Sequence, residues 1–135
     1  MSKQDNINNL QQFGEAVSSG KLEALNELVS ANSVDHDPAP GQVAGPKGYI
    51  DFFSKLRTAF PDLGISLEYL VADDENVSFA YTITGTHQGD FNGIPATNKR
   101  IKARGMQISR FENGKMVERW GSSDELGILK QLGVL

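Results

Sequence analysis

The sequence predicts an α+β fold in which N-terminal helices pack on a strongly curved antiparallel sheet. Up to about residue 60, the apolar residues recur at helical spacing. From Ile65 onward they alternate with polar residues at the period of a strand, and the intervening turns are short. Helices that precede the strands, instead of alternating with them, are typical of the α+β class.

The composition is ordinary for a globular protein and excludes several classes of function. We interpret residues 1–135 as one domain, because 135 residues suffice for a single core. A net charge of −4 argues against a general nucleic-acid or anionic-membrane surface. The chain has no cysteine, which excludes disulfides and thiolate chemistry. The polar start and the lack of an 18-residue apolar window predict a cytoplasmic protein.

Two helices are expected first, each with an apolar stripe facing the core. Ser2–Asp5 has the pattern of a capped helix start, and Gly20 is placed to end the first helix. The stripe of this helix consists of Ile7, Leu10, Phe13 and Val17. The second, shorter helix is predicted from the spacing of Leu22, Leu25, Leu28 and Val29.

A turn-rich segment, residues 32–45, leads to a third helix. Within it, Val34–Asp37 is predicted to form a short edge strand that ends at Pro38. Gly45-Pro46 begins the helix, because proline suits the first helical position, and Phe60-Pro61 ends it. The buried side of this helix is expected to consist of Tyr49, Ile50, Phe53, Leu56 and Phe60.

Four alternating segments follow, and we expect them to form the sheet. The first two contain Ile65–Val71 and Val77–Thr84, with a turn between them. The last two lie within Ile101–Asp124 and are joined by a tight turn at Glu112-Asn113-Gly114. A short helix over Leu126–Leu132 ends the chain.

The turn at Glu112-Asn113-Gly114 sets the register of the last hairpin. We favour a three-residue loop, a type I turn closed by a glycine bulge with Gly114 at positive φ. The pairs would then be Phe111 with Lys115, Ser109 with Val117, Gln107 with Arg119 and Gly105 with Gly121, all on one face. The other face would carry Met106, Ile108, Arg110, Met116, Glu118 and Trp120. The alternative, a two-residue Asn-Gly loop, would pair Gln107 with Trp120.

Several motifs resemble those of a known family. Gly85–Thr97, GTHQGDFNGIPAT, is similar to the GTHxGxFxGIPxT stretch of the SnoaL-like polyketide cyclases, or predicted ester cyclases, of the NTF2-like superfamily. The same family pattern is matched in order by Ala59–Leu63, Arg110–Lys115, Trp120 with Asp124, and Gln131–Gly133. The resemblance covers about Gly45 to Gly133.

The resemblance implies an NTF2-like cone, an α+β barrel with a conical cavity, that usually forms a homodimer packed sheet to sheet. Characterised members close a ring of an anthracycline precursor by an intramolecular aldol step, without a metal or an organic cofactor. Such a step needs an acid/base group beside the acidic carbon and donors aimed at the developing enolate. The implied ligand is a small apolar carbonyl compound.

At three positions the chain departs from the family pattern. The resemblance implies an acid/base aspartate at position 121, a glutamine at 105 and a histidine at 107. This chain has Gly121, Gly105 and Gln107 there. The pocket wall is therefore expected to keep its shape but to lose its proton-transfer groups, which predicts a wider, less polar floor and nearly abolished family reaction.

Asp124 and His87 are the remaining candidates for an acid/base group. Asp124 is the acid that still matches the family, but Ser122–Glu125 also resembles a capping box, so a structural role at the helix start is the alternative. His87 has the strand parity of Tyr81 and should lean towards the cavity. A hydrogen-bonded corner residue is the alternative for His87.

Six side chains are expected to line the ligand site, namely His36, Asp37, Phe53, Tyr81, Gln107 and Arg119. His36 and Asp37 lie where the family tends to place a polar pocket residue before proline, and an exposed turn is the alternative. Arg119 should face Gln107. Because a buried unpaired charge is costly, Arg119 should meet a carboxylate, Gln107 or a ligand oxygen, and we expect this partner to be Asp37. No metal site is expected, because the two histidines form no ligand pair at helical spacing.

The apolar side chains on the outer face predict how the protein associates. Met106, Ile108, Met116 and Trp120 would form an exposed patch, which usually marks an interface, so we expect a homodimer through the open sheet face. Three functions stay open: a cofactor-free cyclase or isomerase, a non-catalytic protein that binds a small molecule, and an interaction module that uses the sheet face.

Overall fold

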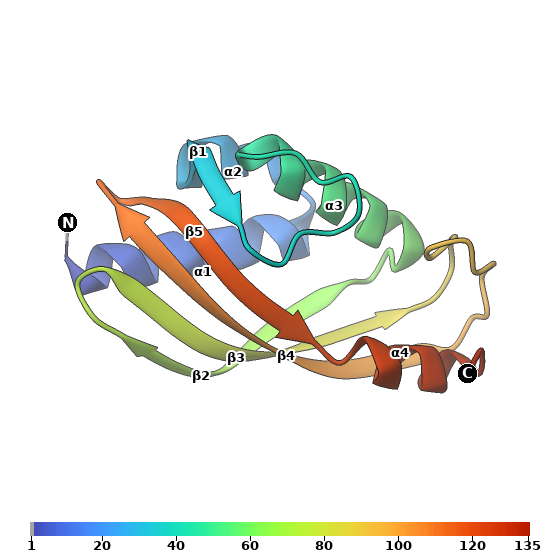
Figure 1. The fold of residues 1–135 in the computed structure, drawn as a ribbon. Helices are drawn as coiled ribbons and strands as arrows, with labels where there is room; N and C mark the ends of the chain where they lie inside the picture. Colours follow the sequence, from blue (N-terminus) through green and yellow to red (C-terminus); the bar gives the residue numbers. More distant parts are fainter. Residues whose placement is uncertain (1) are drawn as a thin grey trace.

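The computed structural model describes residues 2–135 and has three helices over one side of a curved sheet (Figure 1). The helical elements are α1 (Lys3–Ser19), the 3-10 turn η1 (Leu22–Ala24), α2 (Leu25–Leu28), α3 (Pro46–Ala59) and α4 (Glu125–Leu132). The strands are β1 (Val29–Asp35), β2 (Gly64–Ala72), β3 (Asn76–Thr86), β4 (Arg100–Glu112) and β5 (Lys115–Ser123). The predicted α+β class is confirmed.

The sheet has the order β1-β5-β4-β3-β2, so the C-terminal hairpin of β4 and β5 lies next to the N-terminal strand. The pairs β2–β3, β3–β4 and β4–β5 are antiparallel, whereas β1 runs parallel to β5. The prediction of a purely antiparallel sheet is therefore wrong in this one pairing. A parallel neighbour needs a long crossover, and the 79 residues between Asp35 and Lys115 supply it.

The helix ends follow the local sequence as predicted. The hydroxyl of Ser2 accepts a hydrogen bond from the Asp5 backbone N–H in a complete capping box, and Gly20 ends α1 with φ 82°. Pro46 stands in the first turn of α3. Val29, however, begins β1 and does not continue the second helix. The predicted edge strand therefore starts five residues before Val34.

The last hairpin closes with two residues, so the predicted three-residue loop is wrong. Glu112 pairs with Lys115, and Asn113 and Gly114 have φ values of 52° and 78°, as a type I′ turn requires. A bulge follows at once, because Met116 pairs with Phe111 and Glu118 pairs with Arg110. The bulge shifts the register by one further residue.

The final register therefore differs from both alternatives. Gln107 pairs with Gly121, Ser109 with Arg119 and Gly105 with Ser123. Because the total shift is two residues, the predicted inner-face set of Gln107, Ser109, Arg119 and Gly121 keeps its face. Met116 does not, since the bulge turns it into the core, where its side chain is only 1% exposed.

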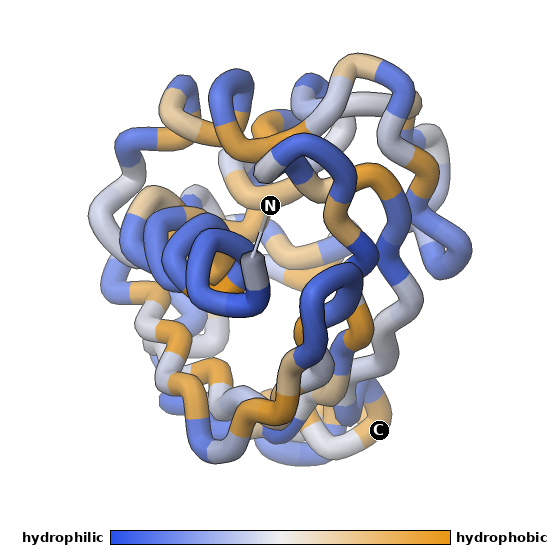
Figure 2. The backbone as a smooth tube through the Cα atoms, turned by 90° about the vertical axis from the view of Figure 1, so that its left-hand side faces the viewer, coloured by the Kyte–Doolittle hydropathy of each residue, from blue (hydrophilic) through white to orange (hydrophobic). Residues whose placement is uncertain are grey.

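A second bulge changes the face of β2. The pairing with β3 shifts between Leu67 and Tyr69, so Glu68 is the extra residue. As a result Tyr69 and Val71 point to the outer face and are exposed, although their spacing from Ile65 suggests one continuous face. Along the strands, hydrophobic and hydrophilic residues alternate (Figure 2).

The core lies between the helices and the inner face of the sheet, in two adjoining clusters. The first joins α1, α2 and Tyr49 of α3 to β3, Phe111 and Met116. The second lies around Phe60 and joins the ends of α1 and α3 to β4 and α4. Phe13, Ile50 and Phe53 pack against both clusters, so the helix layer rests on one continuous apolar interior.

Candidate functional site

The main polar feature of the inner face is an ion pair between Arg119 of β5 and Asp35 of β1. Arg119 Nη1 donates to both carboxylate oxygens of Asp35, at 3.0 and 3.1 Å. The side chains are 18% and 6% exposed, respectively. The parallel pairing of β1 with β5 places the two residues directly side by side. The predicted need of Arg119 for a carboxylate is met, but by Asp35 and not by Asp37.

Gln107 of β4 holds the other edge of the guanidinium. Arg119 Nε donates to Gln107 Oε1 at 2.7 Å, and Gln107 Nε2 donates to the buried Ser109 hydroxyl at 3.0 Å. The predicted contact between Gln107 and Arg119 is therefore present, although the two residues are not directly opposite each other. With Nη1 and Nε both bound, the guanidinium has one fixed orientation.

Two glycines make room for large side chains on this face. A Cβ at Gly105 would collide with the ring and hydroxyl of Tyr81, and one at Gly121 would collide with the guanidinium of Arg119. Tyr81 stands directly opposite Gly105 in the β3–β4 pairing. The space that side chains at positions 105 and 121 would fill is thus occupied by Tyr81 and Arg119, and the predicted wider floor is not present there.

Two buried tyrosines lie close to the ion pair. Burial raises the pKa of Tyr49, and the negative charge of Asp35 raises it further. Burial likewise raises the pKa of Tyr81, against the opposing positive charge of Arg119. Both phenols are therefore neutral at pH 7 and available as hydrogen-bond donors. The buried Tyr49 hydroxyl lies near the hydroxyl of Ser33 and the carboxylate of Asp35, but within residues 2–135 neither the Tyr49 nor the Ser33 hydroxyl makes a hydrogen bond of good geometry.

The segment after β1 connects the ion pair to the surface. Gln42 Nε2 donates to Asp35 Oδ2 at 3.0 Å, and the Asp37 backbone N–H donates to Asp35 Oδ1 at 2.9 Å. Asp37 itself accepts a hydrogen bond from the Gly121 backbone N–H at 2.9 Å. Asp37 therefore lies at the edge of this site and fixes the backbone of β5 beside Arg119.

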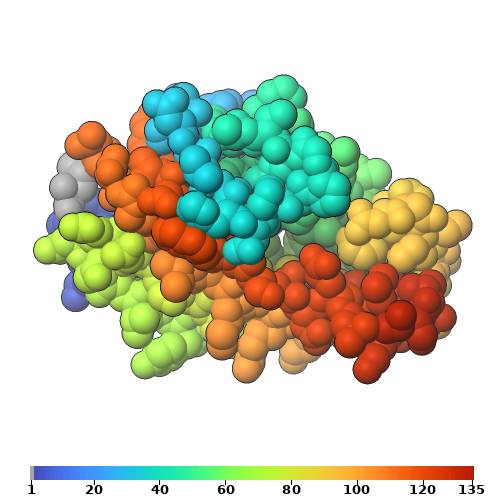
Figure 3. Space-filling model, in the orientation of Figure 1, coloured from blue at the N-terminus to red at the C-terminus, as the bar shows by residue number. Residues whose placement is uncertain are grey.

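The surface is hollowed where this segment approaches the rest of the fold. In Figure 3 the hollow is bordered by residues 36–45 in cyan, α3 in green, the 88–99 loop in yellow and the β5–α4 junction in red-orange.

Phe53 of α3 is half-buried and makes edge-to-face contacts with Phe13 and Phe52. Phe53 is thus an aromatic residue of the helix layer that faces the sheet.

The structure does not bring His36 to this site. His36 follows Asp35, so its side chain lies on the opposite face of the sheet. There its ring stacks on Trp120 at a centroid distance of 4.6 Å, and Nε2 lies 2.7 Å from Glu118 Oε2. His36 is therefore a component of the outer face.

His87 is also separated from the ion pair. It lies six residues beyond Tyr81, roughly 20 Å along the strand direction. The side chain is fully buried against Phe60 and Phe91, and its Nδ1 accepts a hydrogen bond from the Thr97 backbone N–H at 3.2 Å. These contacts fix the two ends of the 88–97 loop together, which corresponds to the predicted alternative of a corner residue.

Asp124 is the N-cap of α4. Its Oδ1 accepts a hydrogen bond from the Gly127 backbone N–H at 2.9 Å, and its own backbone N–H donates to Arg104 O. The cap is the structural role that the sequence pattern offered as the alternative. Residue 124 is thus the cap itself and not a residue of the first turn.

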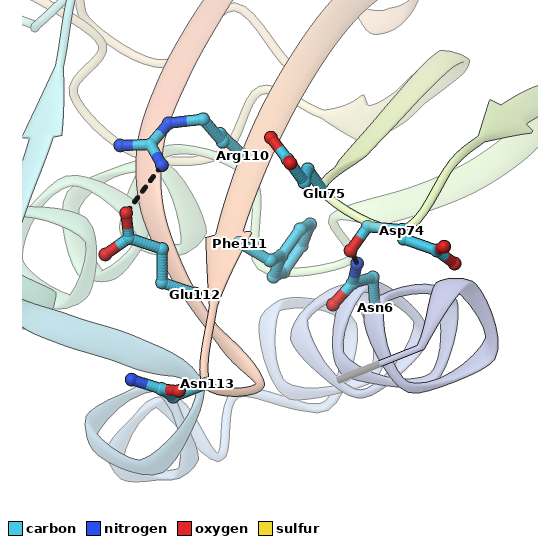
Figure 4. A pocket seen from close by; sticks show the side chains of 7 residues that line it. All are labelled: Asn6, Asp74, Glu75, Arg110, Phe111, Glu112 and Asn113. Atoms are coloured by element: carbon cyan, nitrogen blue, oxygen red, sulfur yellow. Dashed lines mark hydrogen bonds and ion pairs between the residues drawn. The ribbon is translucent and has the colours of Figure 1, made fainter.

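A further hollow of about 530 Å³ lies at the hairpin end of the molecule (Figure 4). It is lined by Asn6, Asp74, Glu75, Arg110, Phe111, Glu112 and Asn113. Arg110 there is paired with Glu112 and Glu118, and Asn6 Nδ2 donates to Asp74 O. None of the eight side chains predicted for the site lines this hollow.

Sequence reasoning missed Asp35, Gln42 and Tyr49 as polar components of the site. Asp35 has the same strand parity as the buried Ser33, and this signal became readable only with the strand's true start at Val29. Within residues 2–135, no group of three His, Asp or Glu side chains could hold a metal ion. None of the described helices is long and apolar enough to cross a membrane.

Comparison with known proteins finds a family model and a related protein that each match most of the chain. The family model described as SnoaL-like polyketide cyclase matches residues 8–132. Aklanonic acid methyl ester cyclase DauD of Streptomyces sp. (strain C5) is 27% identical over 127 residues, which cover 88% of this chain and 76% of DauD.

Solved structures agree with this match. The structure of TsrD from Streptomyces laurentii superposes with a TM-score of 0.91 at 24% identity, covering 100% of this chain and 99% of TsrD. Wild-type IdmH of Streptomyces antibioticus superposes with a TM-score of 0.83 at 28% identity, covering 96% of this chain and 99% of IdmH. The cone of helices on a curved sheet is thus the fold of these proteins.

Proposed function

Because the chain belongs to the SnoaL-like polyketide cyclase family, we propose that it binds a small, flat, mostly apolar carbonyl compound of polyketide type on the inner face of its sheet. The observation that carries this proposal is the orientation of Arg119, which Asp35 and Gln107 fix on an otherwise largely apolar face. An arginine held by two partners is a preorganised donor for a ligand oxygen. A hollow opens at the surface between the 36–45 segment, α3 and the β5–α4 junction (Figure 3).

We expect no ring-closing reaction at this site. An aldol step needs a base beside the acidic carbon. Position 121 holds glycine, the nearby carboxylate of Asp35 is bound by Arg119, and the carboxylate of Asp124 caps a helix. Loss of an aligned acid/base group lowers the rate by a factor of about 10²–10⁴. We therefore expect negligible turnover of aklanonic acid methyl ester, the compound that the name of DauD contains.

We further propose that the protein forms a homodimer through the outer face of the sheet. Six apolar side chains from four strands are exposed there, namely Val34, Tyr69, Val71, Met106, Ile108 and Trp120. Adjacent pairing of Val71, Ser78, Ile108 and Trp120 makes a continuous row across the sheet. Such a patch is typical of an interface, and it also favours the alternative of an interaction module.

Ligand binding can be tested by NMR with 2-methoxy-1,4-naphthoquinone, a neutral flat carbonyl compound. Its addition to ¹⁵N-labelled protein should shift the amide signals of Gly105 and Gly121 on the inner-face strands. The signal of Gln11, on the exposed side of α1, should stay unchanged. Shifts confined to the hairpin hollow of Figure 4, or no saturable shift at all, would contradict the proposal.

Catalysis is tested separately with aklanonic acid methyl ester. We expect no turnover by the natural protein and none by Asp124→Asn. Robust turnover by the natural protein that Asp124→Asn does not reduce would mean that a catalytic site lies elsewhere.

A further inference from the structure

The guanidinium of Arg119 has one edge, at Nη2, that the bonds to Gln107 and Asp35 do not use. Nε donates to Gln107, and Nη1 donates to both oxygens of Asp35. Within residues 2–135, Nη2 donates to no carboxylate, amide or backbone oxygen, and the Tyr81 hydroxyl is the further polar group that interacts with the guanidinium. A side chain that is only 18% exposed thus presents the N–H groups of Nη2 in a fixed direction, with the Tyr81 hydroxyl close by.

Gly121 shows where this free edge lies. A Cβ at position 121 would meet Nη2 and Cζ of Arg119, so the guanidinium rests directly against the β5 backbone. A permanent positive charge therefore occupies the space of a side chain at position 121. The nearby hydroxyls of Tyr49 and Tyr81 add neutral donors, since a tyrosine is protonated at pH 7 and burial raises the pKa of both phenols further.

Among the described residues, the carboxylate nearest to these donors, that of Asp35, is not a free base. The carboxylate of Asp35 accepts hydrogen bonds from Arg119, from Gln42 and from the backbone N–H of Asp37. Its capacity as an acceptor is thus largely used, and it acts as a positioning residue for Arg119. The site can stabilise negative charge on a ligand oxygen, but it is poorly equipped to create that charge by removing a proton.

We propose that the ligand binds as an anion that is already ionised in solution: a flat acidic enol, such as a hydroxyquinone or an enolised 1,3-diketone. Its oxygen accepts hydrogen bonds from Arg119 Nη2 and from a tyrosine hydroxyl, and the protein removes no proton. This inference rests on the proposed ligand-binding function. Charge-assisted hydrogen bonds are about twice as strong as neutral ones, which makes the ionised form the preferred one.

A matched pair of probes tests this inference. 2-Hydroxy-1,4-naphthoquinone is ionised at pH 7 because it is a vinylogous acid, whereas 2-methoxy-1,4-naphthoquinone has the same flat ring system and cannot ionise. Isothermal titration calorimetry at pH 7 should give at least about tenfold tighter binding for the hydroxy compound. Its affinity should fall when the compound is protonated at acidic pH, while that of the methoxy compound stays constant.

The role of Arg119 is tested with the double variant Asp35→Asn/Arg119→Gln, which removes both charges and leaves neither buried alone. The preference for the hydroxy compound should disappear in this variant and persist in Arg104→Gln, a control on the exposed outer face. Near-UV circular dichroism confirms folding, and the pH dependence of the natural protein provides an answer that needs no variant.

Equal affinities of the natural protein for the two compounds would overturn this inference and leave the proposed binding function standing. Binding of neither compound would overturn both. A preference for the hydroxy compound that survives in the double variant would overturn the assignment of Arg119 as its cause.

Discussion

Arg119 Nη1 lies 3.0 and 3.1 Å from the two carboxylate oxygens of Asp35, although 84 residues separate them in the chain. The contact joins the N-terminal edge strand to the C-terminal hairpin. It also sets the direction in which the free edge of the guanidinium points. Stability and the proposed ligand recognition therefore depend on the same pair.

Asp35→Asn should lower the free energy of unfolding by about 3 kcal/mol, because it leaves the Arg119 charge largely buried without a counter-charge. Urea denaturation measures this loss. Asp51→Asn is the matched control, since it breaks the exposed pair with Lys47 and should cost less than about 0.5 kcal/mol. Equal losses in the two variants would mean that the buried pair contributes no more than a surface pair.

Gly105→Ala should destabilise the protein by about 1–3 kcal/mol, because the added Cβ collides with the ring of Tyr81. Gly14→Ala in α1 is the control: it meets nothing within 4 Å and should stabilise by about 0.5–1 kcal/mol. In a Tyr81→Leu background the cost of Gly105→Ala should largely vanish, as a double-mutant cycle would detect. Additive effects would argue against the contact.

Gly114→Val should cost about 1–2 kcal/mol, because residue 114 has φ 78° and a β-branched side chain is strained there. Thermal unfolding followed by circular dichroism measures the loss. Lys115→Val, one residue further in β5, is the control and should change stability little, because valine suits a strand. A tolerated Gly114→Val would contradict the type I′ turn.

Asp62 should contribute to stability at neutral pH and lose that contribution in acid. The Thr86 backbone N–H and hydroxyl donate to its carboxylate at 2.6 and 2.8 Å, and these hydrogen bonds lower its pKa below the usual 3.8. The contribution is therefore complete above about pH 3.8 and declines as the pH falls through the lower, folded-state pKa. Denaturation of Asp62→Asn should show lower stability than the natural protein at pH 7.

The difference between Asp62→Asn and the natural protein should shrink as the pH falls below 3.8. The control is Asp51→Asn, because the exposed carboxylate of Asp51 in the natural protein has no such backbone donors. A difference that is constant from pH 7 to pH 3 would rule out ionisation of Asp62 as its cause.

The outer sheet face should hold a dimer together. Sedimentation equilibrium at micromolar concentration should give twice the 14.7 kDa mass of the chain. Ile108→Lys places a charge in the centre of the apolar row and should shift the equilibrium to monomer. Val43→Lys, at an equally exposed apolar residue in a loop, should leave the mass unchanged. A natural protein that sediments as a monomer would exclude this interface.

The sequence predicted the inner-face wall but not the partner of its arginine. Strand parity places Gln107 and Arg119 on one face, and this placement is correct because the tighter turn and the bulge together shift the register by two residues. The partner required knowledge of the edge strand. If the strand is taken to start at Val34, too few residues remain to show that Asp35 is on the buried face. Asp37 is then the carboxylate that the sequence favours as the partner of Arg119.

Local features were determined by the sequence itself. The Ser2 capping box, the proline start of α3, the glycine end of α1 and the position of the Asn113-Gly114 turn depend on residues within a few positions of each other. The energies involved are those of single turns and caps, which short stretches of sequence decide.

Only the tertiary structure decided the parallel pairing of β1 with β5, the bulge at Met116 and the ion pair between Asp35 and Arg119. The bulge turns Met116 into the core beside Phe111, so its cause is the burial of an apolar side chain against distant elements and not the chemistry of the turn. The ion pair likewise forms because two strands from opposite ends of the chain become neighbours in a site where an unpaired charge is costly.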